Sequence, residues 1–285
     1  NADYAMYQKA LAHGGQGNLE QKAEDLEAFH TRFPKSDLAD DGLYELGTTY
    51  LIFEKNMPAI STFEKLVNDY PHSPFVRQAL LKIGLTYYNT EQNQEALKVL
   101  KKVVENYAGT KESKEALISI RNIYVESNAA DEFFVYVKNI PFANMTNNAQ
   151  DSISYMATEN VYMNGDCESA IPGFSNYLNL YPSGAFNIQA HFYRGECYIK
   201  SNEPDLALKD YEFVLENSGS AFRETALLKS ARILRYNKSF DKAAIRFNEV
   251  VEQASSDAIL GEGLEGLLES NYQFKNYDKV IQNAK

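Results

Sequence analysis

Residues 261–266, Gly-Glu-Gly-Leu-Glu-Gly, are the one stretch that satisfies the G-x-G-x-x-G pattern of dinucleotide-binding loops. In that loop, which follows a strand and opens a helix, the glycines let backbone N–H groups approach a pyrophosphate. Here the repeat register described below places the segment inside a helix, and Glu262 and Glu265 would repel a phosphate. We therefore predict no nucleotide site at these glycines.

Residues 37–42, Asp-Leu-Ala-Asp-Asp-Gly, resemble the start of a calcium loop, but Thr48 stands where that loop needs a bidentate Glu. The three acids are better explained as first-turn residues, which are favoured at a helix N-terminus. The four histidines have no Cys or carboxylate neighbours at metal-ligand spacing; they are His13, His30, His72 and His191. We predict neither a bound metal ion nor a cofactor.

Nucleophilic catalysis has no support in the residue pattern. The H-E-x-x-H, Walker and G-x-S-x-G motifs are absent from the sequence. Cys167 lies between Asp166 and Glu168, which would raise the pKa of its thiol rather than activate it. A bridge to Cys197 is geometrically conceivable, but we expect two unpaired buried thiols, so cysteine chemistry does not reveal the compartment. We predict that the protein is not an enzyme.

The composition limits the classes of partner. The 285 residues carry a formal net charge of −11, with 44% hydrophobic and 24% charged residues. A nucleic-acid surface needs a basic stripe, so nucleic acid is excluded as a partner. No stretch approaches the roughly 20 consecutive apolar residues that span a bilayer, so we predict no transmembrane segment in the chain.

The chain is built from repeats. Aromatic–Pro pairs followed by small polar residues end at Pro34, Pro71 and Pro182, which are 37 and then three times 37 residues apart. Stepping from Ala59 at the same period gives a column that is mostly Ala: Ala59, Ala96, Phe133, Ala170, Ala207, Ala243 and Val280. Twelve residues earlier stands a column of mostly small residues: Gly47, Gly84, Arg121, Thr158, Gly195, Ala231 and Leu268. Such a period is typical of a stacked array.

Each repeat is predicted to form two amphipathic helices. Leu43, Leu46 and Tyr50 follow the spacing of one buried helical stripe, and Ile60 and Phe63 begin a second. Between such stripes lie helix-start signals such as Asn before Pro. Alternating strand patterns are absent from the sequence. The fold class predicted is all-α, with short connections between helices of roughly 12–16 residues.

These columns resemble the tetratricopeptide repeat. The residues that carry the match include Gly47, Tyr50, Ala59, Phe63 and Pro71. The resemblance implies a right-handed superhelical solenoid of about eight helix-turn-helix repeats whose first helices line a concave face. The period of 36–37 departs from the family's usual 34, and no Trp opens a repeat. The longer period is most similar to the envelope-associated branch, which includes outer-membrane assembly lipoproteins and Tol–Pal partners. It favours a periplasmic or cell-envelope location over a cytoplasmic one.

The predicted repeats cover 1–37, 38–74, 75–113, 114–146, 147–184, 185–221, 222–257 and 258–285. The fourth is degenerate, because Arg121 and Phe133 replace its two small residues, and we predict a kink at 139–148. The eighth stops early in its second helix. It would leave Leu264, Leu267, Leu268, Val280 and Ile281 half covered, so we expect the natural protein to continue past Lys285.

The concave face is the predicted functional surface, because Tyr gives large contact area at low entropic cost. Its candidate partner-binding residues are Tyr44, Tyr88, Tyr155, Glu159, Tyr162, Phe192, Glu196, Arg232, Tyr236 and Tyr272. We predict a scaffold that binds a protein or extended peptide containing Lys or Arg. Two alternatives remain open: an architectural spacer within a larger envelope protein, and a glycan or small-molecule binder in the Tyr-rich groove.

Overall fold

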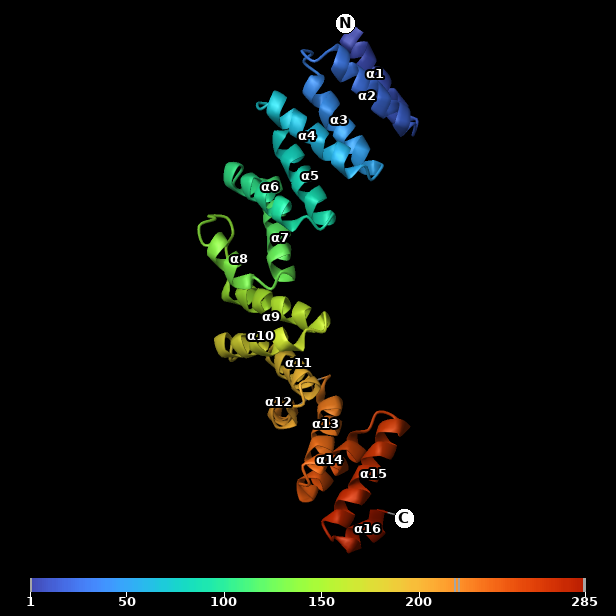
Figure 1. The fold of residues 1–285 in the computed structure, drawn as a ribbon, viewed down its shortest axis with the longest axis vertical. Helices are drawn as coiled ribbons and strands as arrows, with labels where there is room; N and C mark the ends of the chain where they lie inside the picture. The colour runs from blue at the N-terminus through green and yellow to red at the C-terminus, as the bar shows by residue number, and fades with distance from the viewer. Residues whose placement is uncertain (1, 218, 220, 284–285) are drawn as a thin grey trace. The chain divides into compact units, whose positions relative to one another are not determined.

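The computed structural model describes residues 2–217, 219 and 221–283. The chain divides into two compact units, which are treated separately below (Figure 1). Unit 1 comprises Asn1–Ser127 with Asp131–Asn144, and unit 2 comprises Asn128–Ala130 with Met145–Lys285. The described residues form sixteen helices and no strand, which confirms the predicted all-α class.

The helices pack as consecutive antiparallel pairs, as expected for a helical repeat solenoid. Those of unit 1 are α1 (Ala2–Gly15), α2 (Leu19–Arg32), α3 (Ala39–Ile52), α4 (Asn56–Asp69), α5 (Val76–Asn89), α6 (Asn93–Asn106), α7 (Lys111–Glu126) and α8 (Ala130–Val137). Those of unit 2 are α9 (Asn147–Met163), α10 (Cys167–Leu180), α11 (Asn187–Lys200), α12 (Pro204–Glu216), α13 (Arg223–Tyr236), α14 (Phe240–Gln253), α15 (Asp257–Gln273) and α16 (Tyr277–Asn283). Odd-numbered helices are the first helices of their pairs.

The recurring spacing of small residues has a packing cause. Ala59, Ala96 and the other alanines of their column are fully buried. Gly47 on α3 approaches α4 so closely that a Cβ added there would lie 2.6 Å from the ring of Phe63. A side chain of one carbon or none lets two helix backbones come close. The small residues of these columns therefore lie where the two helices of a pair cross.

A left-handed residue ends every first helix. Positive φ angles occur at eight positions with the repeat period: Gly17, Glu54, Glu91, Asn128, Gly165, Asn202, Lys238 and Lys275. After α3 the N–H of Lys55 donates to the carbonyl of Tyr50 at 2.9 Å, and the N–H of Glu54 donates to Leu51. This is the Schellman arrangement, which satisfies the last carbonyls of a helix. The turn therefore has one geometry even where the residue is not glycine.

The aromatic–Pro segments join one repeat to the next. Helix α4 ends at Asp69 and α5 begins at Val76, so residues 70–75 connect them. Pro71 cannot continue α4, because it lacks the backbone N–H. The hydroxyl of Tyr70 donates to the carbonyl of Pro34 at 2.6 Å, which links two successive junctions. These segments thus tie neighbouring repeats together.

The fourth repeat differs from the others in its second helix. Helix α8 has 8 residues, whereas α4 and α6 have 14. Phe133, at the Ala position, is buried against the rings of Tyr124 and Phe134. The boundary between the two compact units, after Asn144, falls inside 139–148. The kink there stays a prediction.

At the C-terminal end, the described residues agree in part with the expected half-covered face. Leu264 and Leu268 are exposed on α15, and Val280 is half-buried. Leu267 is instead buried in the cluster around Phe247, because its side of α15 packs on α14. The side chain of Ile281, and residues 284–285, lie outside the described residues.

The expectation of two free thiols is wrong. Cys167 and Cys197 form a disulfide with their Cα atoms 5.0 Å apart, and the part of the chain that the structure describes has no free cysteine. Cys167 begins α10 and Cys197 lies in the last turn of α11, so the bond joins the fifth repeat to the sixth. The residues are 30 positions apart, as are Asn56 and Thr86 in unit 1, so the repeat itself brings these two positions together.

Candidate functional site

One concave feature that includes predicted site residues is a groove on unit 2 of about 590 Å³. First helices α11, α13 and α15 supply most of its lining, and the start of α12 closes one side. It is lined by Ile199, Asn202, Pro204, Arg232, Ile233, Arg235, Tyr236 and Glu269. Two of the ten predicted residues, Arg232 and Tyr236, therefore meet in one groove on the first-helix side.

Two ion pairs connect α13 to α15 beside the groove. The guanidinium of Arg232 donates from Nε and Nη2 to the two carboxylate oxygens of Glu262, at 2.5 and 2.6 Å. Arg235 donates to Glu269 at 2.8 Å. The hydrogen bond from Arg232 holds the pKa of Glu262 below its ordinary value. Because each pair is bonded in the unbound protein, the groove has fixed charged walls and little net charge.

The floor of the groove is apolar. Ile233 is buried, while Ile199 is 40% exposed and Tyr236 is 79% exposed. A tyrosine this exposed contributes little to the core, yet it can offer a ring face and a hydroxyl to a ligand. The groove thus combines apolar contact area with polar groups at its sides, a composition that ligand-binding surfaces share.

A column of charged residues follows the first helices of unit 2. Glu159, Glu196, Arg232 and Glu269 stand on α9, α11, α13 and α15 at intervals of 37, 36 and 37 residues. We call them the face column. Glu196 accepts from Lys229 at 2.5 Å and from the hydroxyl of Tyr211 at 2.6 Å. Its carboxylate therefore ties α11 to both α12 and α13.

Several predicted aromatic residues are structural. Tyr155 and Phe192 are only 3% and 8% exposed, so their rings are not available as contact surface. Tyr155 stacks on Phe186 with centroids 4.5 Å apart, and Phe192 stacks on Phe222. Burial, followed by the hydrogen bond to Glu159, raises the pKa of Tyr155, so its hydroxyl stays protonated and donates. These rings therefore support the first-helix surface of unit 2 from the core and are not part of its accessible surface.

Tyr162 is half-buried. Its ring stacks on Tyr193 at 4.6 Å, and the ammonium of Lys200 lies 5.6 Å from its centroid. Burial raises the pKa of Tyr162. Tyr272, the last predicted residue of unit 2, is exposed on α15 outside the groove lining.

The predicted residues of unit 1 lie apart from one another. Tyr44 on α3 stacks on Phe75 with centroids 4.7 Å apart, and the ammonium of Lys82 lies 5.9 Å from the centroid of its ring. Tyr88 on α5 donates to Glu126 on α7 at 2.6 Å. Both are half-buried, and neither lines the groove of unit 2.

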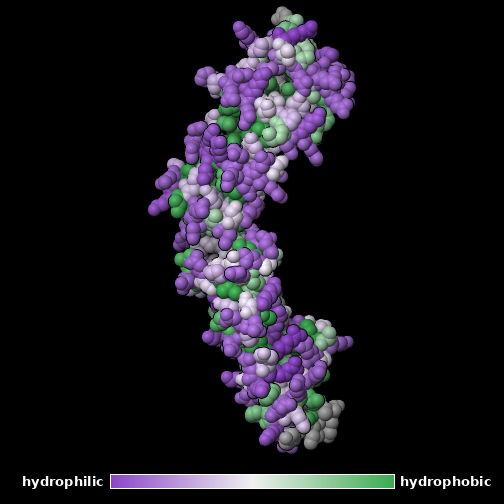
Figure 2. All heavy atoms as spheres, in the orientation of Figure 1, coloured by the Kyte–Doolittle hydropathy of each residue, from purple (hydrophilic) through white to green (hydrophobic). Residues whose placement is uncertain are grey.

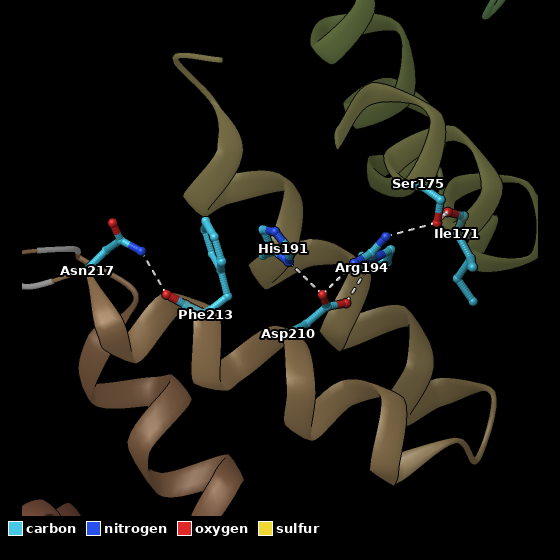
Figure 3. A network of polar contacts seen from close by, with 7 residues as sticks. All are labelled: Ile171, Ser175, His191, Arg194, Asp210, Phe213 and Asn217. Carbon is cyan, nitrogen blue, oxygen red and sulfur yellow. Dashed lines mark hydrogen bonds and ion pairs between the residues drawn. The ribbon is translucent and has the colours of Figure 1, made fainter. Parts of the chain in front are cut away.

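A buried polar network in unit 2 is absent from the sequence predictions (Figure 3). The carboxylate of Asp210 on α12 accepts from Nε and Nη2 of Arg194 and bonds to Nδ1 of His191 at 2.6 Å. Arg194 also donates to Ser175 on α10 at 3.0 Å. The ring of His191 stacks on Phe213. The network joins α10, α11 and α12, so its role is to hold consecutive repeats together.

Unit 1 contains a simpler version of this network. Asp25 on α2 accepts from Lys9 at 2.9 Å and bonds to Nδ1 of His13 at 2.8 Å. Lys9 and Asp25 are 16 residues apart, as are Arg194 and Asp210. In other repeats the same two columns hold pairs such as Leu46 and Thr62. Apart from Arg246, the other repeats place uncharged residues in these two columns, so a pair of opposite charges there was a readable signal.

The glycine-rich and aspartate-rich motifs of the sequence lie within or at the start of helices of the structure. Residues 261–266 lie inside α15, as predicted, so their glycines do not form a phosphate loop. Asp40 and Asp41 lie in the first turn of α3. In the described residues, the structure groups no three His, Cys, Asp or Glu side chains that could hold a metal ion. None of the described helices has the length and apolarity needed to cross a membrane.

The fold and the groove define the class: a protein of stacked helix pairs with an open groove on its first helices. Residues 4–36 match the tetratricopeptide repeat family model, and residues 36–134 match that of the YfiO outer membrane lipoproteins. Residues 4–134 thus match tetratricopeptide-repeat and related lipoprotein families, and the helix-pair fold continues through the other described residues. Both matches fall on α1–α8.

Solved structures of similar fold include a tetratricopeptide repeat protein from Parabacteroides merdae ATCC 43184, 16% identical over 94% of this chain and 100% of that one, with a TM-score of 0.45. The structure of Naa15/Naa10 bound to HypK-THB is 13% identical over 98% of this chain and 41% of that one, at 0.49. The TPR2AB domain of yeast Sti1 in its pHSP90 complex is 12% identical over 99% and 96%, at 0.44. No curated protein matches the sequence.

Proposed function

We propose that the protein is a non-catalytic scaffold that binds a partner protein or extended peptide on the first-helix face of unit 2. Tetratricopeptide-repeat families are generally non-catalytic scaffolds. The observation that carries the proposal is the groove that Ile199 and the exposed ring of Tyr236 line together with the ion-paired Arg232 and Arg235.

An extended segment suits this surface better than a globular domain. On the face drawn in Figure 2, hydrophilic residues predominate and the hydrophobic ones form separate small patches. Stable docking of a folded domain usually uses a larger contiguous area. A peptide needs only a groove for one or two anchoring side chains, with polar groups beside it for its backbone. The available contacts are Glu159, Tyr162, Glu196, Arg232 and Tyr236, with Tyr155 and Phe192 supporting them from the core.

A ligand that contains Lys or Arg fits the charge of the protein. The formal net charge of −11 attracts cationic segments over distances of about 8–10 Å at physiological salt. Three of the four residues of the face column are glutamates. Association is therefore expected to weaken as the salt concentration rises.

Site-specific photo-crosslinking tests the proposal. A photoreactive p-benzoylphenylalanine is placed at Tyr236 or Met156 on first helices, or at the exposed control positions Ile245 on α14 and Leu180 on α10. We expect the same protein adduct from both first-helix positions and none from the controls, in the cells that naturally express the protein. Equal labelling from all four positions, or none from any, would contradict the proposal and favour an architectural spacer.

We also propose that the protein works in an oxidising compartment such as the bacterial envelope. The Cys167–Cys197 disulfide supports this, since disulfides persist mainly outside the reducing cytosol. The match of residues 36–134 to outer membrane lipoproteins supports it independently. Thiol alkylation of intact cells, followed by mass spectrometry, should find both cysteines unmodified until a reductant is added. Alkylated cysteines without reduction would contradict this location.

A further inference from the structure

The fifth helix pair of the chain, α9 with α10, has an unusual charge pattern. Residues 139–193 contain no Lys and no Arg. Its hydrogen-bonded carboxylates therefore meet neutral donors: Glu159 accepts from the hydroxyl of Tyr155 at 2.7 Å, and Asp151 accepts from the hydroxyl of Tyr177 at 2.5 Å. Neutral donors satisfy hydrogen bonds but leave the negative charge uncompensated.

The later pairs of unit 2 behave differently. Glu196 is paired with Lys229, Glu262 with Arg232, and Glu269 with Arg235. Along the first helices of unit 2, Glu159 is the glutamate of the face column that lacks an ion pair within the described residues. A partner's cation would therefore gain most at this carboxylate, because no ion pair inside the protein has to be broken first.

The surroundings of Glu159 also suit a ligand. Met156 and Met163 lie three residues before it and four after it, so all three share one side of α9. They are 48% and 61% exposed. Methionine is flexible and polarisable, and it can pack along the aliphatic stem of a Lys or Arg. Lys200 over the ring of Tyr162 shows a cation of the chain itself held close by.

The groove lies on the same side of unit 2, two first helices further along. Glu159 on α9 and Arg232 on α13 belong to one face column, with Glu196 on α11 between them. Contacts link α9 to α11, and the Lys229–Glu196 bond links α11 to α13. Two steps of 8–10 Å between helix axes make roughly 20 Å. An extended chain of about six residues covers that distance.

We propose that one partner segment binds both places, with a Lys or Arg on Glu159 and a large apolar side chain in the groove beside Tyr236, about six residues apart. The inference rests on the proposed function and adds to it the chemistry and spacing of the ligand. The occupant is thus a segment of a partner protein that is cationic at one end and apolar at the other.

Synthetic fluorescent peptides test this inference by anisotropy with the full chain. One peptide carries Arg-Lys and Phe separated by five Ser or Gly residues; a second has the same residues in reverse order. Further peptides shorten the spacer to one residue, replace Arg-Lys by Gln-Gln, or replace Phe by Ser. We expect one of the two long-spacer orders to bind at least tenfold more tightly than every other peptide. Equal binding of the long and short spacers would overturn the inference.

Two substitutions assign the ends of the peptide. Glu159→Gln keeps an acceptor for Tyr155 but removes the charge, so it should weaken the Arg-Lys peptide about tenfold and leave the Gln-Gln peptide unchanged. Tyr236→Ala should weaken peptides with Phe and not those with Ser. Glu212→Gln on α12 and Ile245→Ala on α14 are the matched exposed controls. Equal effects of Glu159→Gln and Glu212→Gln would overturn the assignment.

The two proposals fail separately. First-helix crosslinks to a protein, together with peptides that show no preference for charge or spacing, would leave the scaffold function standing and overturn the two-anchor ligand. Absence of crosslinks, together with peptide binding that obeys the predicted spacing, would contradict the scaffold function in those cells and still support the two-anchor ligand chemistry of the groove. Absence of both would overturn both proposals.

Discussion

The two units have the same helix-pair fold but different residues on their first helices. The face column of unit 2, Glu159 to Glu269, continues in unit 1 as Thr48, Leu85 and Asn122, none of which is charged. The columns that fix helix crossing, such as Ala59 and Ala207, are alike in both units. Packing therefore constrains some columns through the whole chain and leaves the face free to differ.

The two units also differ in the kind of evidence they carry. Unit 1 contains the matches to known families, and unit 2 contains the features from which the function is proposed. The family matches fall on the helices α1–α8, whereas the groove, the disulfide and the Asp210 network all belong to unit 2. The family models thus describe the half of the chain that lacks the groove, the disulfide and the Asp210 network. The binding chemistry has to be inferred from residues that depart from the repeat pattern.

The largest expected difference between the units is at their buried aspartates. Asp210→Ala should lower the free energy of unfolding by about 3–5 kcal/mol, because a mostly buried guanidinium loses its carboxylate. Asp25→Ala should cost only about 1–2 kcal/mol, since its partner Lys9 is 58% exposed and can return to water. Urea denaturation followed by circular dichroism measures both. Equal losses would show that the two networks are equivalent.

Reduction of the disulfide should affect unit 2 alone. Closing a loop of 30 residues stabilises a chain by about 3–4 kcal/mol through the entropy of the unfolded state. The double variant Cys167→Ser/Cys197→Ser should therefore expose the amides of α10 and α11 to hydrogen exchange sooner, while those of α3 and α4 keep their wild-type rates. Faster exchange in both regions would mean that the two units unfold together.

Two glycine substitutions, one in each unit, should change stability in opposite directions. Gly47→Ala is expected to destabilise by about 1–3 kcal/mol, because the new Cβ meets the buried ring of Phe63. Gly261→Ala, which meets no atom within 4 Å, should stabilise α15 by up to about 1 kcal/mol. Thermal unfolding of the two variants decides this. A loss of stability at Gly261 would contradict the open space found there.

The smallest effect concerns pH. Burial would raise the pKa of Asp25, but the hydrogen bonds from Lys9 and His13 outweigh it and hold the pKa below its ordinary value of 3.8. The stability that depends on this charge is thus fully present above that value and is lost as the pH falls below it. The difference in urea midpoint between the wild type and Asp25→Asn should shrink on acidification below pH 4. A constant difference would rule out this linkage.

The sequence allowed prediction of those features that packing forces into every repeat. The small residue at Gly47 and the Ala at Ala59 recur because helices cross there, so their period was visible. The left-handed turn was missed, because six of its eight positions are not glycine and hence give no residue signal. The turn is set by the helix end it caps, and a residue such as Glu54 adopts it at a cost of about 1–2 kcal/mol.

Contacts between repeats were harder to foresee. The disulfide pairs residues 30 positions apart. This separation predicts that the two residues are close only when the stacking of the repeats is known. At the candidate site, the residue types were identified but not their exposure. Tyr155 and Phe192 follow the same helical pattern as exposed neighbours, and their burial depends on Phe186 and Phe222 from the connecting segments. Side chains contributed by connections are not visible in a helical periodicity.

The same disulfide limits how far the protein can be stretched. A repeat array pulled from its ends lengthens as successive helix pairs detach and straighten. The 30 residues closed by Cys167 and Cys197 cannot straighten while the bond holds, which withholds about 100 Å of extension. Under tension the rest of the array could therefore extend while the segment between the two cysteines stays folded back, and a reductant would let that segment extend as well.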